Sequence, residues 1–135
     1  MFSSVLGGAE PASFADAALN GWAPDGGMYW PTTIDPVTPE TLVAWGGLSY
    51  AQLCEEMLKR FIPAADPDIS RAELTNIVSS AFDAFGCNSV VQVRPLHEGG
   101  LRVVELWHGP TLAFKDLGMS VLGRVLRHLL RRRRE

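Results

Sequence analysis

Only two lysines occur among the 135 residues of the chain, and the second, Lys115, stands where an extended run changes into an amphipathic one. Its immediate neighbours are Phe114 and Asp116. At the start of a helix the positive end of the backbone dipole disfavours an ammonium group by a few tenths to about 1 kcal/mol. Desolvation by nearby apolar side chains also lowers the pKa of an amine. Both effects favour the neutral amine, which is the form that attacks an aldehyde to make a Schiff base.

The residue types alone leave a second interpretation open, in which Lys115 is a partly exposed side chain with no chemical role. An ion pair with Asp116 would favour the charged amine and oppose the chemical interpretation. The desolvation argument depends on four apolar neighbours, which are Leu112, Ala113, Phe114 and Leu117. The choice between the two interpretations therefore depends on how the flanking segments fold.

The composition of the whole chain is that of an ordinary globular protein of about one domain, with 47% hydrophobic and 20% charged residues. No signal peptide is visible at the start, and no apolar run approaches the roughly 20 residues of a transmembrane helix. The two cysteines, Cys54 and Cys87, do not make a disulfide framework. We expect Cys54 to be reduced and buried, and the location to be cytoplasmic.

Charge is distributed unevenly along the chain. Residues 124–135 contain six arginines and one glutamate, which gives +5, so the net charge of −3 leaves about −8 on the preceding part. A basic tail on an acidic body is compatible with nucleic acid or an anionic surface as a partner. No aromatic residues alternate with these arginines, however, and cations near a helix C-terminus complement its dipole. We therefore expect a solvated helix end, with neither nucleic acid nor a membrane as partner.

Capping signals predict a series of short helices in the first two thirds of the chain. They begin at Ser13, Thr38, Ser49 and Ser70, and the last of them is expected to end at Gly86. Residues 22–37 contain several prolines and are expected to form a loop, with a turn around Asp25, Gly26 and Gly27.

The remaining third changes character. Residues 89–94 and 101–107 are rich in β-branched side chains and predict an antiparallel hairpin, on which the helices should pack. A last helix begins near Phe114 or Lys115 and carries a strong apolar stripe with few elements left to cover it. The fold class expected is α+β, with an exposed C-terminal helix that could associate with itself.

Three stretches of the chain resemble threonine synthases and threonine synthase-like proteins. The most specific is "ELWHGPTLAFKD", residues 105–116, which is similar to the segment of that family that holds the pyridoxal-phosphate lysine. The second is "SFADAALNGWAPDGGMYWP", residues 13–31, which resembles the family's N-terminal segment. The third is "LSYAQLCEEMLKRFI", residues 48–62, which is similar to a helix of the family.

This resemblance implies a fold-type II pyridoxal-phosphate enzyme that converts O-phospho-L-homoserine and water to L-threonine and phosphate. Lys115 would hold the cofactor as a Schiff base and then move protons at the α- and β-carbons of the substrate. Phe114 and Asp116 would contribute to cofactor binding by shaping the surroundings of the lysine. Loop-positioning roles are implied for His108, Gly109, Pro110 and Thr111, and no metal site is implied.

Threonine synthases are several times longer than this chain, and no glycine-rich phosphate-binding string follows Lys115. We therefore expect an N-terminal fragment of an α/β enzyme that is inactive on its own. Residues 1–88 would be the helical N-terminal domain, and residues 89–135 the hairpin, lysine loop and helix that start the catalytic domain.

Two alternative functions stay open. The first is a threonine synthase-like phospho-lyase, which degrades phosphorylated amino-acid derivatives without making threonine. The second is a truncated module without catalytic activity, in which the helical body and the arginine tail bind a partner. The exact substrate and the oligomeric state do not follow from the sequence.

Overall fold

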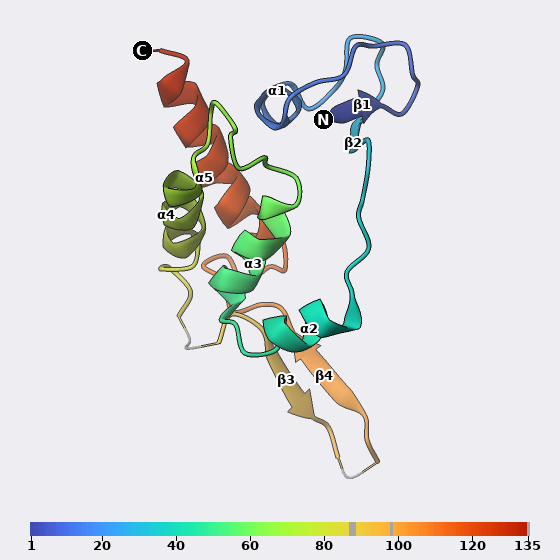
Figure 1. The fold of residues 1–135 in the computed structure, drawn as a ribbon. Coiled ribbons are helices and arrows are strands. Elements are labelled where there is room, and N and C mark those ends of the chain that lie inside the picture. The colour runs from blue at the N-terminus through green and yellow to red at the C-terminus, as the bar shows by residue number, and fades with distance from the viewer. Residues whose placement is uncertain (87–88, 98, 135) are drawn as a thin grey trace.

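Short helices and two small antiparallel sheets form the chain, seen here in a computed structural model that describes residues 1–86, 89–97 and 99–134 (Figure 1). In chain order the elements are β1 (Phe2–Ser4), α1 (Phe14–Asn20), β2 (Tyr29–Pro31), α2 (Pro39–Trp45), α3 (Tyr50–Lys59), α4 (Arg71–Ala81), β3 (Gln92–Pro95), β4 (Arg102–Glu105) and α5 (Asp116–Arg132). This mixture confirms the α+β class. Cys87 lies outside the described residues.

The predicted caps begin the first four helices. The side chains of Ser13, Thr38, Ser49 and Ser70 each accept a hydrogen bond from a backbone N–H in the first turn. At Ser49 and Ser70 the third helical residue also accepts from the backbone N–H of the cap, which completes two capping boxes. The start of each of these helices is therefore determined locally, by the cap residue and, in two of them, by the residue three positions later.

A small sheet at the N-terminus is absent from the sequence-based expectation. β1 pairs antiparallel with β2, with Ser3 opposite Trp30, so part of the expected loop 22–37 is a strand. Three-residue strands are too short to show an alternating pattern, and Pro31 is tolerated because it ends its strand. The expected turn is present, and its Asp25 carboxylate accepts hydrogen bonds from Ser4 Oγ (2.7 Å) and from the N–H of Gly8 (2.8 Å).

Two further boundaries differ from expectation. α4 ends at Ala81, earlier than Gly86, yet Phe82 and Phe85 stay buried in the turn that follows. Because both side chains are buried, the sequence shows the apolar spacing of a longer helix, although the backbone is no longer helical at these positions. The hairpin strands β3 and β4 are also shorter than predicted, with Val93 opposite Val104.

The main core lies between α1, α3, α4 and α5. Its buried side chains are Ala15, Ile62, Ile69, Leu74, Ile77, Val78, Ala81, Phe82, Phe85, Val121, Val125 and Leu129. The expectation that α5 leaves its apolar stripe exposed is wrong for Val121, Val125 and Leu129, which are buried, and α1 and α4 contact this helix. Exposed apolar side chains remain on this helix at Leu122 (38%) and Leu130 (50%), and self-association through them stays a prediction.

The helices do not pack on the hairpin as expected. In Figure 1, β3 and β4 project away from the helices, beyond α2. Val93 and Val104 are more than half exposed, whereas Val90, just before β3, packs against the core. The hairpin is therefore attached at its base, and both of its faces are accessible.

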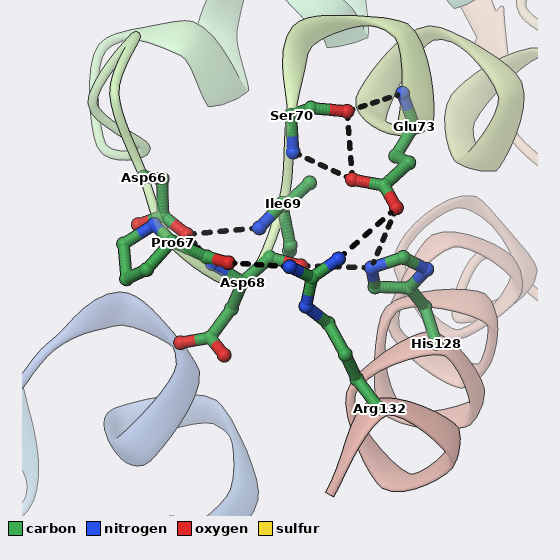
Figure 2. Close-up of polar contacts among 8 residues, drawn as sticks. All are labelled: Asp66, Pro67, Asp68, Ile69, Ser70, Glu73, His128 and Arg132. Atoms are coloured by element: carbon green, nitrogen blue, oxygen red, sulfur yellow. Dashed lines mark hydrogen bonds and ion pairs between the residues drawn. The ribbon is translucent and has the colours of Figure 1, made fainter. Parts of the chain in front are cut away.

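A polar cluster fixes the C-terminal half of α5 to the start of α4 (Figure 2). His128 Nε2 donates to the backbone carbonyl of Asp68 at 2.8 Å, because a carbonyl can only accept. Arg132 donates to the carbonyl of Pro67 at 2.9 Å and to the carboxylate of Glu73 at 3.4 Å. Glu73 is also the capping-box partner of Ser70, so one carboxylate serves both the helix start and the contact between helices.

The core includes residues from both sides of position 88, since α5 contributes Val121, Val125 and Leu129 to it. The division of the chain at that position stays a prediction. Within the described ranges, no helix combines the length and hydropathy needed to cross a bilayer.

Candidate active site

Lys115 lies at the N-cap of α5, one residue from where the sequence places the helix start. Its side chain is exposed, and its Nζ lies 4.6 Å from the centroid of the Phe114 ring. Phe114 itself is 61% exposed and Leu112 is 74% exposed. Leu112 and Phe114 therefore do not bury the amine as expected, because their own side chains are largely exposed, whereas Leu117 packs against the core.

Asp116 does not pair with Lys115, which was the arrangement that would have opposed the chemical interpretation. Its carboxylate is buried and accepts from the backbone N–H of Thr111 at 2.8 Å and from the Thr111 hydroxyl at 2.6 Å. The hydroxyl hydrogen bond, more than any other contact, holds the pKa of Asp116 below its ordinary value. Over the described residues no ion pair involves Lys115.

The two lysines of the chain are therefore in opposite situations. Lys59 forms ion pairs with Glu55 at 2.7 Å and with Glu56 at 2.8 Å. The hydrogen bond to Glu55 is the main reason that the pKa of Lys59 is raised. Lys115 has neither partner, and its amine is available to a reagent or a cofactor from solvent.

Gly109 lies directly against Asp116, on the inside of the loop that leads to the lysine. A β-carbon added at Gly109 would overlap the Asp116 side chain, whose carboxyl carbon would lie 2.8 Å away. Only glycine allows the loop to approach the first residue of α5 this closely. The loop also contains Leu112 at a positive φ of 59°, a conformation that β-carbon-bearing residues seldom adopt.

His108 contacts the end of β4. Its Nε2 lies 2.8 Å from the carboxylate of Glu105, and the ring is mostly covered. A carboxylate accepts, so Nε2 carries the proton in this contact. Glu105 also lies 3.5 Å from Arg94 on β3. The contact joins the base of the hairpin to the lysine loop, and its partner Glu105 was not among the residues predicted from sequence.

The residues predicted for the site thus form two groups. Gly109, Thr111 and Asp116 contact one another and hold the loop on the helix start, while His108 holds the loop on the hairpin. Pro110 lies exposed in the turn between them. Phe114 and Lys115 are presented outward as an adjacent ring and amine. The signal that could have identified Glu105 is its spacing of three residues from His108 across the end of a strand.

Pyridoxal phosphate fits this arrangement at one of its two attachment points. The exposed and unpaired Lys115 amine is suited to a covalent bond with an aldehyde, and the Phe114 ring beside it offers a flat apolar surface. The buried Asp116 is already occupied by Thr111, so its part is to shape the loop. Among the described residues that follow Lys115, no glycine-rich loop forms a phosphate cradle.

The architecture and the site together define a helical N-terminal unit that delivers a lysine at the start of a helix. A family model described as "Threonine synthase N terminus" matches residues 1–82, and the chain belongs to this family. Threonine synthase-like 2 of Xenopus laevis is 39% identical over 132 residues, which are 98% of this chain and 27% of the relative. Threonine synthase of Pseudomonas aeruginosa is 37% identical over 134 residues, covering 99% of this chain and 28% of the relative.

Solved structures agree with the sequence relatives. The pyridoxal-phosphate-bound threonine synthase of Brucella melitensis superimposes with a TM-score of 0.89 at 34% identity, over 99% of this chain and 28% of that one. The yeast threonine synthase gives a TM-score of 0.85 at 30% identity, over 92% and 25%. The fold is therefore that of the N-terminal portion of threonine synthase. The chain spans about a quarter of the length of these proteins.

Proposed function

We propose that this chain is the lysine-bearing N-terminal portion of a pyridoxal-phosphate-dependent lyase that converts O-phospho-L-homoserine and water to L-threonine and phosphate. The observation that carries the proposal is Lys115, which is exposed at the start of α5 and forms no ion pair with any described residue, inside a segment that resembles the family's lysine motif. Family membership supports the same reaction class.

In this function the residues of the chain have separate tasks. Lys115 binds the cofactor covalently through Nζ and later moves protons at the α- and β-carbons of the substrate. The cofactor supplies an electron sink when it is bound. Phe114 limits the space beside the amine, and Asp116 with Thr111 keeps the loop and helix start in one geometry. His108 and Glu105 connect this loop to the hairpin.

We further propose that these 135 residues alone do not turn over substrate, and that the reaction requires the larger protein represented by the relatives. The chain corresponds to about a quarter of the length of its relatives. In this proposal it supplies the lysine, and residues of the rest of the protein bind the cofactor phosphate and the substrate. The proposed location is the cytoplasm, in keeping with the free, half-covered Cys54 thiol, whose pKa burial raises.

A threonine synthase-like phospho-lyase is the second candidate. The observation that favours it is the 39% identity to threonine synthase-like 2 of Xenopus laevis, beside 37% for a bacterial threonine synthase. Both candidates use the same lysine. They are distinguished by offering O-phosphohomoserine to the larger protein and measuring threonine and phosphate separately, since phosphate without threonine indicates the phospho-lyase.

Reductive labelling tests the role of the lysine. The chain is incubated with pyridoxal phosphate, reduced with borohydride and mapped by mass spectrometry of its peptides. We expect weak labelling concentrated on Lys115, because Lys59 is held by two carboxylates. The matched variants are Lys115→Ala, which should remove the label, and Lys59→Ala, which should leave it unchanged.

Two results would contradict the proposal. Label that stays after Lys115→Ala, on Lys59 or on the amino group of Met1, would rule out the assigned residue. Tight stoichiometric labelling of Lys115 in the isolated chain would leave the residue in place but refute the claim that the chain is incompetent alone.

A further inference from the structure

The arginines of α5 and its end differ in whether they form ion pairs. Arg132 and Arg133 are neutralised, because Arg132 pairs with Glu73 at 3.4 Å and Arg133 pairs with Asp16. Arg127 and Arg131 are exposed and form no ion pair with any residue of the described ranges. The unpaired arginines are four residues apart, so they lie on one side of the helix.

A groove runs beside this unpaired group, between α5 and α4. Its volume is about 230 Å³, and its polar lining includes Asn76 and Ser80 from α4 together with Arg124, Arg127 and Arg131 from α5. No carboxylate belongs to the described residues that line the groove, although Glu73 reaches its edge, 3.8 Å from His128 Nε2. The groove therefore gathers the positive charge of Arg124, Arg127 and Arg131, with a single carboxylate at its margin.

One arginine of the groove is already held in place. Arg124 donates through Nε to Ser80 Oγ at 3.1 Å and through Nη1 to the carbonyl of Ser120 at 3.1 Å. Its remaining N–H groups keep their donor capacity. A positioned guanidinium beside two free ones, within two helical turns, matches the requirement for several charge-assisted hydrogen bonds to one anion.

We propose that this groove binds a compact polyphosphate anion, a ligand bearing two or three linked phosphate groups. Arginine forks match phosphate oxygens in pairs, and the row from Arg124 to Arg131 extends over about 10 Å of helix. The amide of Asn76 adds a neutral donor on the opposite wall. The site lies on the far half of α5 from Lys115 and is separate from the proposed cofactor attachment.

The groove favours a compact anion over nucleic acid. Its lining contains no Phe, Tyr or Trp, and base stacking on aromatic side chains is a main source of affinity for single strands. The one ring in the lining, His128, is already held by its hydrogen bond to the carbonyl of Asp68 at 2.8 Å. The positive surface along α5 is also short, because Glu73 pairs with Arg132 and Asp16 pairs with Arg133, and the exposed Arg134 lies beyond the end of the helix. A long strand that left the groove would meet a body that carries about −8.

Calorimetric titration of the chain with inorganic tripolyphosphate tests the site, at about 0.15 M ionic strength where distant charges are screened. We expect saturable binding of one equivalent. Arg127→Ala and Arg131→Ala should each weaken it about five- to ten-fold, because each removes one charge-assisted contact. Arg131→Lys should lose part of the affinity, since it keeps the charge without the fork.

The matched control is Arg102→Ala on β4, another exposed arginine without an ion pair in the described residues, and binding should stay within two-fold. The groove arginines contribute nothing to the core, so circular dichroism should show folded variants. Absence of saturable binding would overturn the proposal, as would an equal loss in Arg102→Ala. Tighter binding of a twelve-nucleotide single strand, with the same dependence on Arg127 and Arg131, would identify a nucleic-acid surface and overturn it too.

Discussion

Gly109 and Asp116 touch across the loop that presents Lys115, with no room between them for a β-carbon. The contact closes the loop on the first residue of α5, and the two hydrogen bonds from Thr111 to the same carboxylate reinforce it. This contact fixes the position of the Lys115 backbone, since Lys115 is the residue between the loop and the helix. The surroundings of the amine thus depend on a glycine six positions earlier.

Gly109→Ala should open this loop. The new methyl group would overlap Asp116, and overpacking of this kind typically destabilises a protein by about 1–3 kcal/mol. The matched control is Gly118→Ala inside α5, where a β-carbon meets nothing within 4 Å and alanine should stabilise by about 0.5–1 kcal/mol. Urea unfolding of both variants measures the difference. Equal effects of the same sign would show that the close approach is not maintained in solution.

Asp116 should make the loop sensitive to acid. Its pKa is lowered in the folded chain, chiefly by the Thr111 hydroxyl, so the stabilisation is present above the ordinary value of 3.8 and is lost as the pH falls through the lower folded value. The amide proton of Thr111, followed by NMR from about pH 5 to pH 2, should shift with this titration. Asp116→Asn should remove the shift, and Thr111→Val should move its midpoint toward 3.8. A midpoint above 3.8 in the parent chain would contradict the assigned hydrogen bond.

The two capping boxes should differ in their effect on stability. Ser49→Ala removes a cap whose partner Gln52 forms no hydrogen bond to another helix in the described part of the chain, and the usual loss is about 1 kcal/mol. Ser70→Ala removes a cap whose partner Glu73 also receives Arg132, so the loss should be larger, up to about 2 kcal/mol. Denaturant unfolding of the two variants compares them directly. If both variants lose the same free energy, the polar cluster between α4 and α5 adds nothing to its cap.

At position 112, glycine should give a more stable protein than alanine. Its φ of 59° disfavours any residue with a β-carbon, by about 1 kcal/mol, and its side chain is too exposed to contribute much burial. Leu112→Gly should therefore be more stable than Leu112→Ala by about that amount, which is the reverse of the order at ordinary helical positions. Thermal unfolding of the pair gives the sign. A less stable glycine variant would show that the left-handed conformation is absent in solution.

Helix positions were predictable because their signals are local. A capping serine such as Ser70 and its partner Glu73 occupy adjacent turns, and the structure reproduces both. The small β1–β2 sheet was not predictable, since each strand has three residues and the pairing joins Ser4 to Tyr29, which lie on either side of α1 in the chain. The cover of α5 was missed for a related reason, because the partners of Val125 come from helices tens of residues earlier.

The candidate site shows the same division. Lys115 and its place at a helix start follow from the local pattern, and the structure has them within one residue. The partners of the surrounding polar residues do not follow from it. Asp116 next to Lys115 suggests an ion pair by adjacency, yet the carboxylate points back to Thr111 because the loop folds over the helix start. Which neighbour a side chain contacts is decided by that fold.

α5 has 17 residues, which makes it a rod of about 25 Å with the amine at one tip. The other tip is pinned by Arg132 on Glu73 and by Arg133 on Asp16. If α5 tilted by about 5° around its C-terminal end, the amine would move by about 2 Å. Displacements of about 1 Å are already enough to slow catalysis substantially. The position of the Lys115 nitrogen is thus set in part by ion pairs at the opposite end of α5.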